Sequence, residues 1–321
     1  MVKRLAPWVL KGGISIGLIV WVLSKVHLAT AWEQAKSLDA DMLLAAVALS
    51  VVQIVLGAVR WGIVLRALSA TFATVQTLIV YYIGVFFSMV LPGAVGGDAM
   101  RMWFARRAGM SLAAAVNSVM LERAVTVLGL VLLVAGLQPL LLARAPTIPG
   151  TWVFPVLSVL GVICVFVLAV LDRLPMSFRR WRLVRGLAQL AADTRLLFFR
   201  PRFGLSCLVV AIIGHVNLSL SCYMLAVGLH LPIDAVDCLV LIPPVILVMT
   251  LPISIAGWGL RETAMVTAFG FIGLPQESAL VLSILFGILG MATALPGGLV
   301  FLLSSEYRTP RAVVEADQAE A

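Results

Sequence analysis

The sequence predicts an all-α polytopic membrane protein. Hydrophobic residues make up 62% of the 321 residues and charged residues only 12%, whereas soluble domains carry about 25% charged residues. Apolar runs of about 20 residues recur along the chain, and each is long enough to cross a bilayer. The runs are continuous rather than alternating at every second residue. Because a membrane-spanning chain must satisfy its backbone hydrogen bonds internally, these observations favour helices over a barrel.

Six apolar segments predict full transmembrane helices. They are 8–24, 42–66, 112–138, 152–171, 204–226 and 278–303. The first segment follows Lys3 and Arg4 as in a signal peptide, but no small-x-small cleavage pattern follows it, so we expect a retained helix. We expect a single integral membrane domain over residues 1–307 and a short polar tail over 308–321.

Two further apolar regions are interrupted near their middle. Residues 77–107 contain LPGAVGGDAMR and residues 236–272 contain LPISIAGWGLR. Proline and glycine interrupt helical hydrogen bonding, so a break is predicted in each region. The residues expected to make these breaks are Pro92, Gly93, Gly96, Gly97, Pro252, Gly257 and Gly259.

The charges of the loops orient the segments. The loop 172–202 carries eight arginines and should be cytoplasmic, whereas the loop 227–235 has no Lys or Arg and should be external. Both loop assignments can hold if the segment 77–107 enters the membrane from the cytoplasm and returns there, and if 236–272 enters from outside and returns outside. We predict two opposed re-entrant hairpins, although full out-and-back crossings give the same loop sides. Both termini are expected in the cytoplasm of a bacterial cell, at its inner membrane.

The two interrupted regions resemble each other. Aligned without gaps, 91–101 and 251–261 share a Leu, a Pro, a Gly and the final Arg. Repeats of opposite orientation are common in secondary transporters, where broken helices meet near the midplane. The sequence therefore predicts an inverted repeat, and the alternative is that both motifs are packing kinks.

Seven charged residues interrupt the apolar regions and are the predicted substrate-binding residues. They are Arg60, Asp98, Arg101, Glu122, Arg123, Arg261 and Glu262. A charge at a helix centre costs about 2.5–3.5 kcal/mol, so these side chains should face one another or a hydrated cavity. Four arginines against three carboxylates leave one positive charge unmatched, which an anionic headgroup would balance. Arginine suits phosphate because its planar fork binds two oxygens.

Each of these residues also has a structural interpretation. Glu122–Arg123 and Arg261–Glu262 would form ion pairs with other helices. Arg60 would extend toward the membrane surface, and Asp98 would cap the helix that follows it. His215 and Asn217, inside an apolar segment, would relay protons or bond neighbouring helices.

Other classes of function find no support in the sequence. The net charge of +8 is typical of basic loops that meet anionic lipid headgroups, and no soluble basic domain suggests a nucleic-acid partner. The four cysteines lack metal-ligand spacing. We expect no metal, no cofactor and no catalytic residue.

Several motifs together resemble a known family. They are RW at 60–61, LPGAVGGDAMR at 91–101, LER at 121–123, PISIAGWGLRE at 252–262 and GLPQESALVLSILFGIL at 273–289. Over residues 40–305 the chain is similar to the membrane domain of lysylphosphatidylglycerol synthases and to a related stand-alone flippase-like family. The resemblance implies movement of lipids between leaflets, with a glycosyltransferase or a lipid-modifying enzyme as partner. The soluble aminoacyl-transfer domain of the synthases is not matched, so the resemblance does not imply synthase activity.

The sequence thus predicts a flippase or transporter for an anionic lipid, either a phospholipid or a polyprenyl-phosphate-linked lipid. One alternative is a membrane enzyme acting on a lipid phosphate, with Asp98, Glu122, Glu262 or His215 as its base or nucleophile. Another is a protein that presents lipid to a partner enzyme without transporting it.

Overall fold

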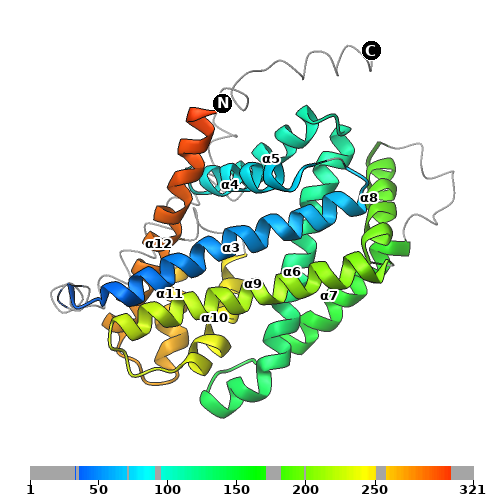
Figure 1. The fold of residues 1–321 in the computed structure, drawn as a ribbon. Helices are drawn as coiled ribbons and strands as arrows, with labels where there is room; N and C mark the ends of the chain where they lie inside the picture. The colour runs from blue at the N-terminus through cyan, green and yellow to red at the C-terminus, as the bar shows by residue number, and fades with distance from the viewer. Residues whose placement is uncertain are drawn as a thin grey trace, which may run out of the picture.

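The computed structural model describes residues 33, 36–70, 72–90, 95–170, 182–198, 200–250 and 258–304. Within these ranges its regular secondary structure is helical, with turns and short loops between the helices (Figure 1). Within these ranges the helices are α3 (Ala40–Ala67), α4 (Thr74–Val90), α5 (Val95–Arg107), α6 (Leu112–Arg144), α7 (Val153–Val170), α8 (Arg182–Phe198), α9 (Pro201–Gly228), α10 (Ala235–Met249), α11 (Leu260–Gly270) and α12 (Gln276–Leu303).

Four of the described helices, α3, α6, α9 and α12, are long and apolar enough to cross a membrane. They coincide with four of the six predicted spans. Helix α7 coincides with a fifth predicted span, 152–171. Its apolar stretch Val153–Val167 is shorter than the four long helices, so α7 is grouped with the shorter apolar helices α4 and α10. The remaining predicted span, 8–24, lies outside the described residues. The chain is therefore a multi-pass membrane protein.

Apolar side chains on the outside of the helices agree with a lipid environment. Along α7, Val159, Ile163 and Phe166 are all exposed. Exposed apolar surface of this extent is unfavourable in water, whereas in a bilayer it contacts acyl chains. The exposed apolar side chains of α7 are therefore expected to face lipid.

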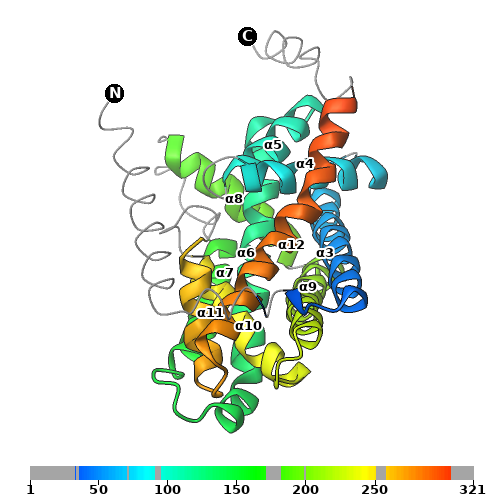
Figure 2. The same ribbon diagram turned by 90° about the vertical axis from the view of Figure 1, so that its left-hand side faces the viewer.

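Both interrupted regions consist of two helices. Helix α4 ends at Val90 and α5 begins at Val95, while α10 ends at Met249 and α11 begins at Leu260. The two helices of each region pack against each other. In both views α4 and α5 lie toward the top and α10 and α11 toward the bottom (Figure 2).

The predicted breaking residues fall into three groups. Pro92, Gly93, Pro252 and Gly257 lie outside the described residues. Gly259 precedes α11 with a φ of 81°, a backbone conformation that glycine adopts without strain.

Gly96 and Gly97 lie inside the first turn of α5 rather than in the break. A Cβ atom on Gly97 would collide with the carbonyl group of Gly84 and the hydroxyl of Ser88. The absent side chain therefore lets α4 and α5 touch backbone to backbone, as small residues commonly do between membrane helices.

Replacing Gly97 with Val should force α4 and α5 apart. Overpacking of this kind costs about 1–3 kcal/mol, and we expect a lower midpoint in thermal unfolding of the detergent-purified protein. Gly136→Ala is the matched control, because its new methyl group would meet no atom within 4 Å. Equal midpoints for Gly97→Val and the wild type would contradict the tight contact.

Helices α3 and α9 run side by side in opposite directions along much of their length (Figure 1). The amide of Asp39 donates to the carbonyl of Gly228 at 2.9 Å, which joins the start of α3 to the end of α9. Further along, Asn217 donates to the carbonyl of Leu49 at 2.9 Å and to the side chain of Gln53 at 3.1 Å. Asn217 thus makes the interhelical contact that its position inside an apolar span suggested.

An ion-pair group joins α6 to α10 at their ends. Arg144 lies 2.8 Å from Asp234 and 3.0 Å from Asp237. Asp234 precedes α10 and accepts a hydrogen bond from the backbone amide of Asp237 at 2.9 Å, and this bond together with Arg144 lowers the pKa of Asp234 below its ordinary value. A lowered carboxyl pKa stabilises the fold above the unfolded pKa of about 3.9, and this stability is lost as pH falls through the folded pKa.

Asp234→Ala should therefore lower the unfolding midpoint at pH 7, where loss of an N-cap costs about 1 kcal/mol. The difference from wild type should shrink as pH falls below about 4. Thermal unfolding across pH measures both effects, with Asp41→Ala as the control that removes an exposed first-turn carboxylate from α3. A difference that stays constant down to pH 3 would argue against the charged form of Asp234.

Candidate functional site

Five of the seven charged residues predicted to form the site come together in one buried group, here called the ion-pair cluster. Its members are Arg60 on α3, Asp98 and Arg101 on α5, and Glu122 and Arg123 on α6. Four of them are buried, while the side chain of Arg123 is 45% exposed. The cluster therefore has one side chain that reaches toward its surroundings.

Each carboxylate of the ion-pair cluster is shared between two arginines. Glu122 accepts from Arg60 Nε at 2.7 Å and from Arg101 Nη1 at 3.2 Å. Asp98 accepts from Arg101 Nη2 at 2.5 Å and from Arg123 Nε at 3.0 Å. Among these five residues three arginines face two carboxylates, so with all groups ionised the described members of the ion-pair cluster sum to one positive charge.

These contacts decide between the sequence interpretations. Arg60 is only 5% exposed and is bonded to Glu122, so it does not extend to the membrane surface. Asp98 does not precede α5 as a cap but lies in its first turn, where a carboxylate favours the positive end of the helix dipole. Glu122 and Arg123 form ion pairs with other helices, as one interpretation of the sequence suggested.

Aromatic rings hold Arg101 in place. Its guanidinium carbon lies 5.5 Å from the ring centre of Trp61 and 5.0 Å from that of Tyr81, within the range of cation–π attraction. Gly84 leaves room for the side chain, since a Cβ there would come within 3.0 Å of Arg101 Cγ. Next to the ion-pair cluster lies a small polar cavity of about 70 Å³, which Ser88 and Thr126 also line.

Arg261 and Glu262 form a second group at the start of α11. They pair with each other, with Arg261 Nη2 at 2.5 Å and Nε at 3.0 Å from Glu262 Oε1. The other oxygen, Oε2, accepts from the amide of Gly259 at 2.6 Å. The ring of Trp258 lies 4.6 Å from the guanidinium. The structure thus divides the seven predicted residues into five and two, and this pair is made between sequence neighbours rather than with other helices.

Arg261 lines a larger cavity, here called the central cavity, of about 260 Å³. Its walls come from α3, α4, α9, α10 and α12 and from the start of α11. The residues lining it are Ser50, Gln53, Ile54, Tyr81, Val85, Met89, Leu218, Met249, Trp258, Arg261, Phe286, Gly287, Gly290, Met291 and Thr293. Among these described residues Arg261 is the one charged side chain, so the central cavity is mainly apolar with a single cation.

Two features fix Arg261 at the wall of the central cavity. Ser283 on α12 lies 3.4 Å from its Nε atom. Gly287, one turn further along α12, faces the guanidinium so closely that a Cβ atom would collide with it. Tyr81 and Val85 on α4 line both the central cavity and the cavity beside the ion-pair cluster, so the two spaces are neighbours.

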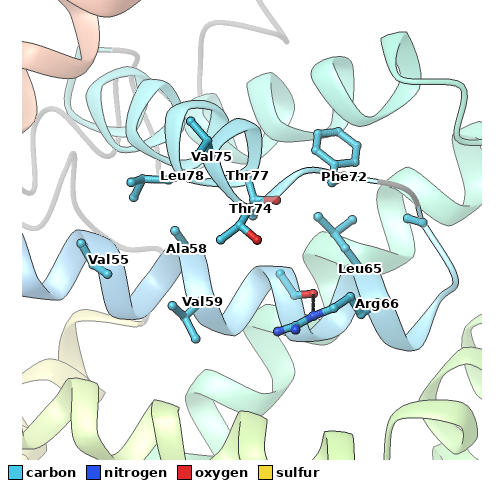
Figure 3. Close-up of a pocket in the computed structure, with 12 residues that line it drawn as sticks. Val55, Ala58, Val59, Leu65, Arg66, Phe72, Thr74, Val75, Thr77 and Leu78 are labelled. Atoms are coloured by element: carbon cyan, nitrogen blue, oxygen red, sulfur yellow. Dashed lines mark hydrogen bonds between the residues drawn. The ribbon is translucent and has the colours of Figure 1, made fainter.

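Two other spaces are apolar grooves. One, of about 210 Å³, lies between α3 and α4 and is lined by Val55, Phe72 and Val75 among others (Figure 3). Arg66 borders it and is bonded back to the carbonyl of Gly62 at 3.2 Å. The other, of about 260 Å³, lies beside α10 and α11. Neither groove presents a buried charge.

The site includes residues that the sequence did not single out. Tyr81, Trp258 and Ser283 contact its arginines, yet each is unremarkable in an apolar segment. Trp258 and Ser283 lie within the motifs that carry the family resemblance, and the RW pair places Trp61 directly after Arg60. Among the described residues no group of three His, Cys, Asp or Glu side chains could hold a metal ion.

These features define a class of protein: a multi-pass helical membrane protein with ionised side chains held between its helices. The chain belongs to the family described as the lysylphosphatidylglycerol synthase TM region, whose model matches residues 8–298. This match confirms the resemblance seen in the short motifs, and it covers all seven charged residues. No individual curated protein matches the chain. The family ties this membrane protein to the modification or transport of lipids.

Proposed function

We propose that the protein transports an anionic, phosphate-bearing lipid between the leaflets of a membrane. The observation that carries the proposal is the composition of the central cavity. Its walls are mainly apolar and its one charged lining residue among those described is Arg261. A lipid has the same division, with a charged headgroup attached to apolar chains. Ligand cavities of this kind use few polar groups to orient a mostly apolar ligand.

The geometry around Arg261 suits a phosphate. Its guanidinium is bonded to Glu262, which keeps a second hydrogen bond to the amide of Gly259. An arriving phosphate would compete with Glu262 Oε1 for Arg261, because an arginine fork binds two phosphate oxygens side by side. Glu262 would retain its backbone partner during the exchange, so the carboxylate would not be left without a donor.

The ion-pair cluster would be the second place for the headgroup. Its excess positive charge lies in a poorly solvated region, where electrostatic attraction is strong. Arg60, Arg101 and Arg123 would bind phosphate there, while Asp98 and Glu122 balance the arginines when the site is empty. Arg123, as the exposed member, would meet the headgroup first.

The arrangement of the helices supports an inverted repeat. The ion-pair cluster and the Arg261–Glu262 pair each include the first turn of a helix that follows an interruption, α5 and α11. Helix N-termini favour anions. We infer that α4–α5 and α10–α11 are opposed re-entrant hairpins in the inner membrane of a bacterium, with both chain termini in the cytoplasm. The partner would be a glycosyltransferase or a lipid-modifying enzyme.

Transport and chemistry can be separated in one experiment. Purified protein is reconstituted into vesicles containing a fluorescent phosphatidylglycerol, and a membrane-impermeant quencher reports how fast label leaves the inner leaflet. We expect faster exchange than in protein-free vesicles, with the lipid recovered unchanged by mass spectrometry. Conversion of the lipid to a new product would favour the enzyme alternative. Unchanged lipid with no exchange above background, for phosphatidylglycerol and for a labelled polyprenyl phosphate tested in the same way, would overturn transport and favour the lipid-presenting alternative.

A further inference from the structure

The buried imidazole of His215 on α9 lies beside the ion-pair cluster without belonging to it. Its Nε2 atom lies 3.1 Å from the carbonyl oxygen of Thr126 on α6. Because a carbonyl oxygen only accepts hydrogen bonds, Nε2 must carry the hydrogen, and Nδ1 therefore carries the free lone pair. Nδ1 is buried and has no hydrogen-bond partner among the described residues. Such an unpaired base within a membrane helix is costly and marks a functional candidate.

His215 is connected to the ion-pair cluster on two sides. On α6, the hydroxyl of Thr126 lies 2.7 Å from the carbonyl oxygen of Glu122 and 3.3 Å from its Oε1 atom. On α3, the guanidinium of Arg60 lies next to the residue before His215, since a Cβ on Gly214 would be 3.7 Å from Arg60 Nη1. A change of charge at the imidazole is therefore felt by Arg60 and Glu122.

The other charged groups on the helices packed against α9 are occupied elsewhere or lie near helix ends. Asp193 on α8 accepts from Asn117 at 2.6 Å, and Asp237 on α10 is paired with Arg144. The remaining charged side chains that the structure describes on these helices are Asp41 and Arg66 near the ends of α3, Arg144 at the end of α6, Arg195 in the last turn of α8 and Glu277 in the first turn of α12. Arg123 on α6 belongs to the ion-pair cluster itself. The ion-pair cluster is thus the electrostatic neighbour of His215.

We propose that Nδ1 of His215 takes up one proton from solvent when an anionic headgroup enters the ion-pair cluster, and releases it when the anion leaves. The empty cluster already holds one excess positive charge, so a second positive charge beside it is unfavourable. An anion bound to the arginines removes this obstacle. Binding of the anion and of the proton then favour each other by the same factor, as linkage requires. The inference rests on the proposed transport function and adds the ion to which transport is coupled.

Proton uptake on binding provides the test. The full chain, purified in detergent, is titrated with dihexanoyl phosphatidylglycerol in a calorimeter at pH 7, in two buffers that differ in ionisation enthalpy. A phosphodiester does not titrate near neutral pH, so any proton taken up enters the protein. We expect the wild type to take up a substantial fraction of one proton for each lipid bound.

The matched variant is His215→Gln, whose side-chain amide can still donate to Thr126 but cannot hold a proton. It should bind the lipid with uptake near zero. The control is Ser219→Ala, which removes a buried hydroxyl on the same helix that bonds to the carbonyl of His215 and should retain the wild-type uptake.

Three results would overturn the inference. Lipid binding by the wild type with no proton uptake would overturn proton coupling while leaving the transport proposal in place. Equal uptake by wild type and His215→Gln would assign the proton to another group. Absence of lipid binding by a folded wild-type protein would overturn both the proton site and the anionic substrate.

Discussion

Glu122→Ala should be strongly destabilising, lowering the free energy of unfolding by about 3–5 kcal/mol. The side chain is 2% exposed and is bonded to Arg60 and Arg101. Its removal would leave Arg60 buried without its counter-charge and Arg101 with Asp98 alone. We expect poor recovery from membranes and a clearly lower thermal midpoint in detergent.

A double substitution distinguishes the effect of an unpaired buried charge from the effect of lost side-chain volume. Replacing a buried ion pair by apolar side chains of similar size is often neutral, whereas removing one partner is not. Arg60→Met combined with Glu122→Leu should therefore unfold at a higher temperature than Glu122→Ala. Glu122→Gln should fall between them, because it keeps an acceptor without the charge. A wild-type midpoint for Glu122→Ala would show that Arg60 and Arg101 do not depend on this carboxylate.

Arg261→Ala should reduce lipid transport at least tenfold while leaving the protein folded. A hydrogen bond to a charged group contributes about 1.5–3 kcal/mol, which corresponds to a factor of roughly 10–150 in rate or affinity. Removing Arg261 takes the counter-charge from buried Glu262, so some loss of stability is expected. The bonds that Glu262 keeps to Gly259 and Ser283 limit this loss, and Arg261→Met, which fills more of the space, is the second variant to compare. Quencher-accessible exchange of labelled phosphatidylglycerol measures the rate, and thermal unfolding measures the fold.

Two further variants sharpen this result. Gly287→Leu would push the Arg261 guanidinium out of its position without removing its charge, so it should also slow transport. Arg202→Ala removes an exposed arginine from the first turn of α9 and should transport at the wild-type rate. Wild-type exchange by a folded Arg261→Ala protein would remove the basis for placing the headgroup in the central cavity.

The sequence predicted the long helices because their signal is local. An apolar run of sufficient length needs no distant partner to become a membrane helix, and α3, α6, α9 and α12 follow this rule. The sequence also predicted that the charges in apolar segments would have partners, because each such charge is costly to place in a membrane without one.

The identity of the partners could not be predicted in this way. The pair between Arg60 and Glu122 exists because α3 meets α6, although the two residues are separated by 62 positions. Arg261 and Glu262 seemed equally suited to reach other helices, yet they pair with each other because α11 begins at this point and Gly259 holds the second carboxylate oxygen. Tyr81 carries no charge and became part of the site only through the approach of α4 to Arg101.

The contact between α3 and α9 has a mechanical consequence. The bond between Asp39 and Gly228 fastens one end of the two helices, and the bonds from Asn217 fasten their middle. Near the other end, the thiol of Cys207 donates to the carbonyl of Arg60 at 3.7 Å. Hydrogen bonds at three positions along their length oppose sliding of α3 against α9, so we expect the two helices to move as one unit. In the transport that we propose, alternating exposure of the site to the two sides would then come from tilting of α4–α5 or α10–α11 relative to α3 and α9.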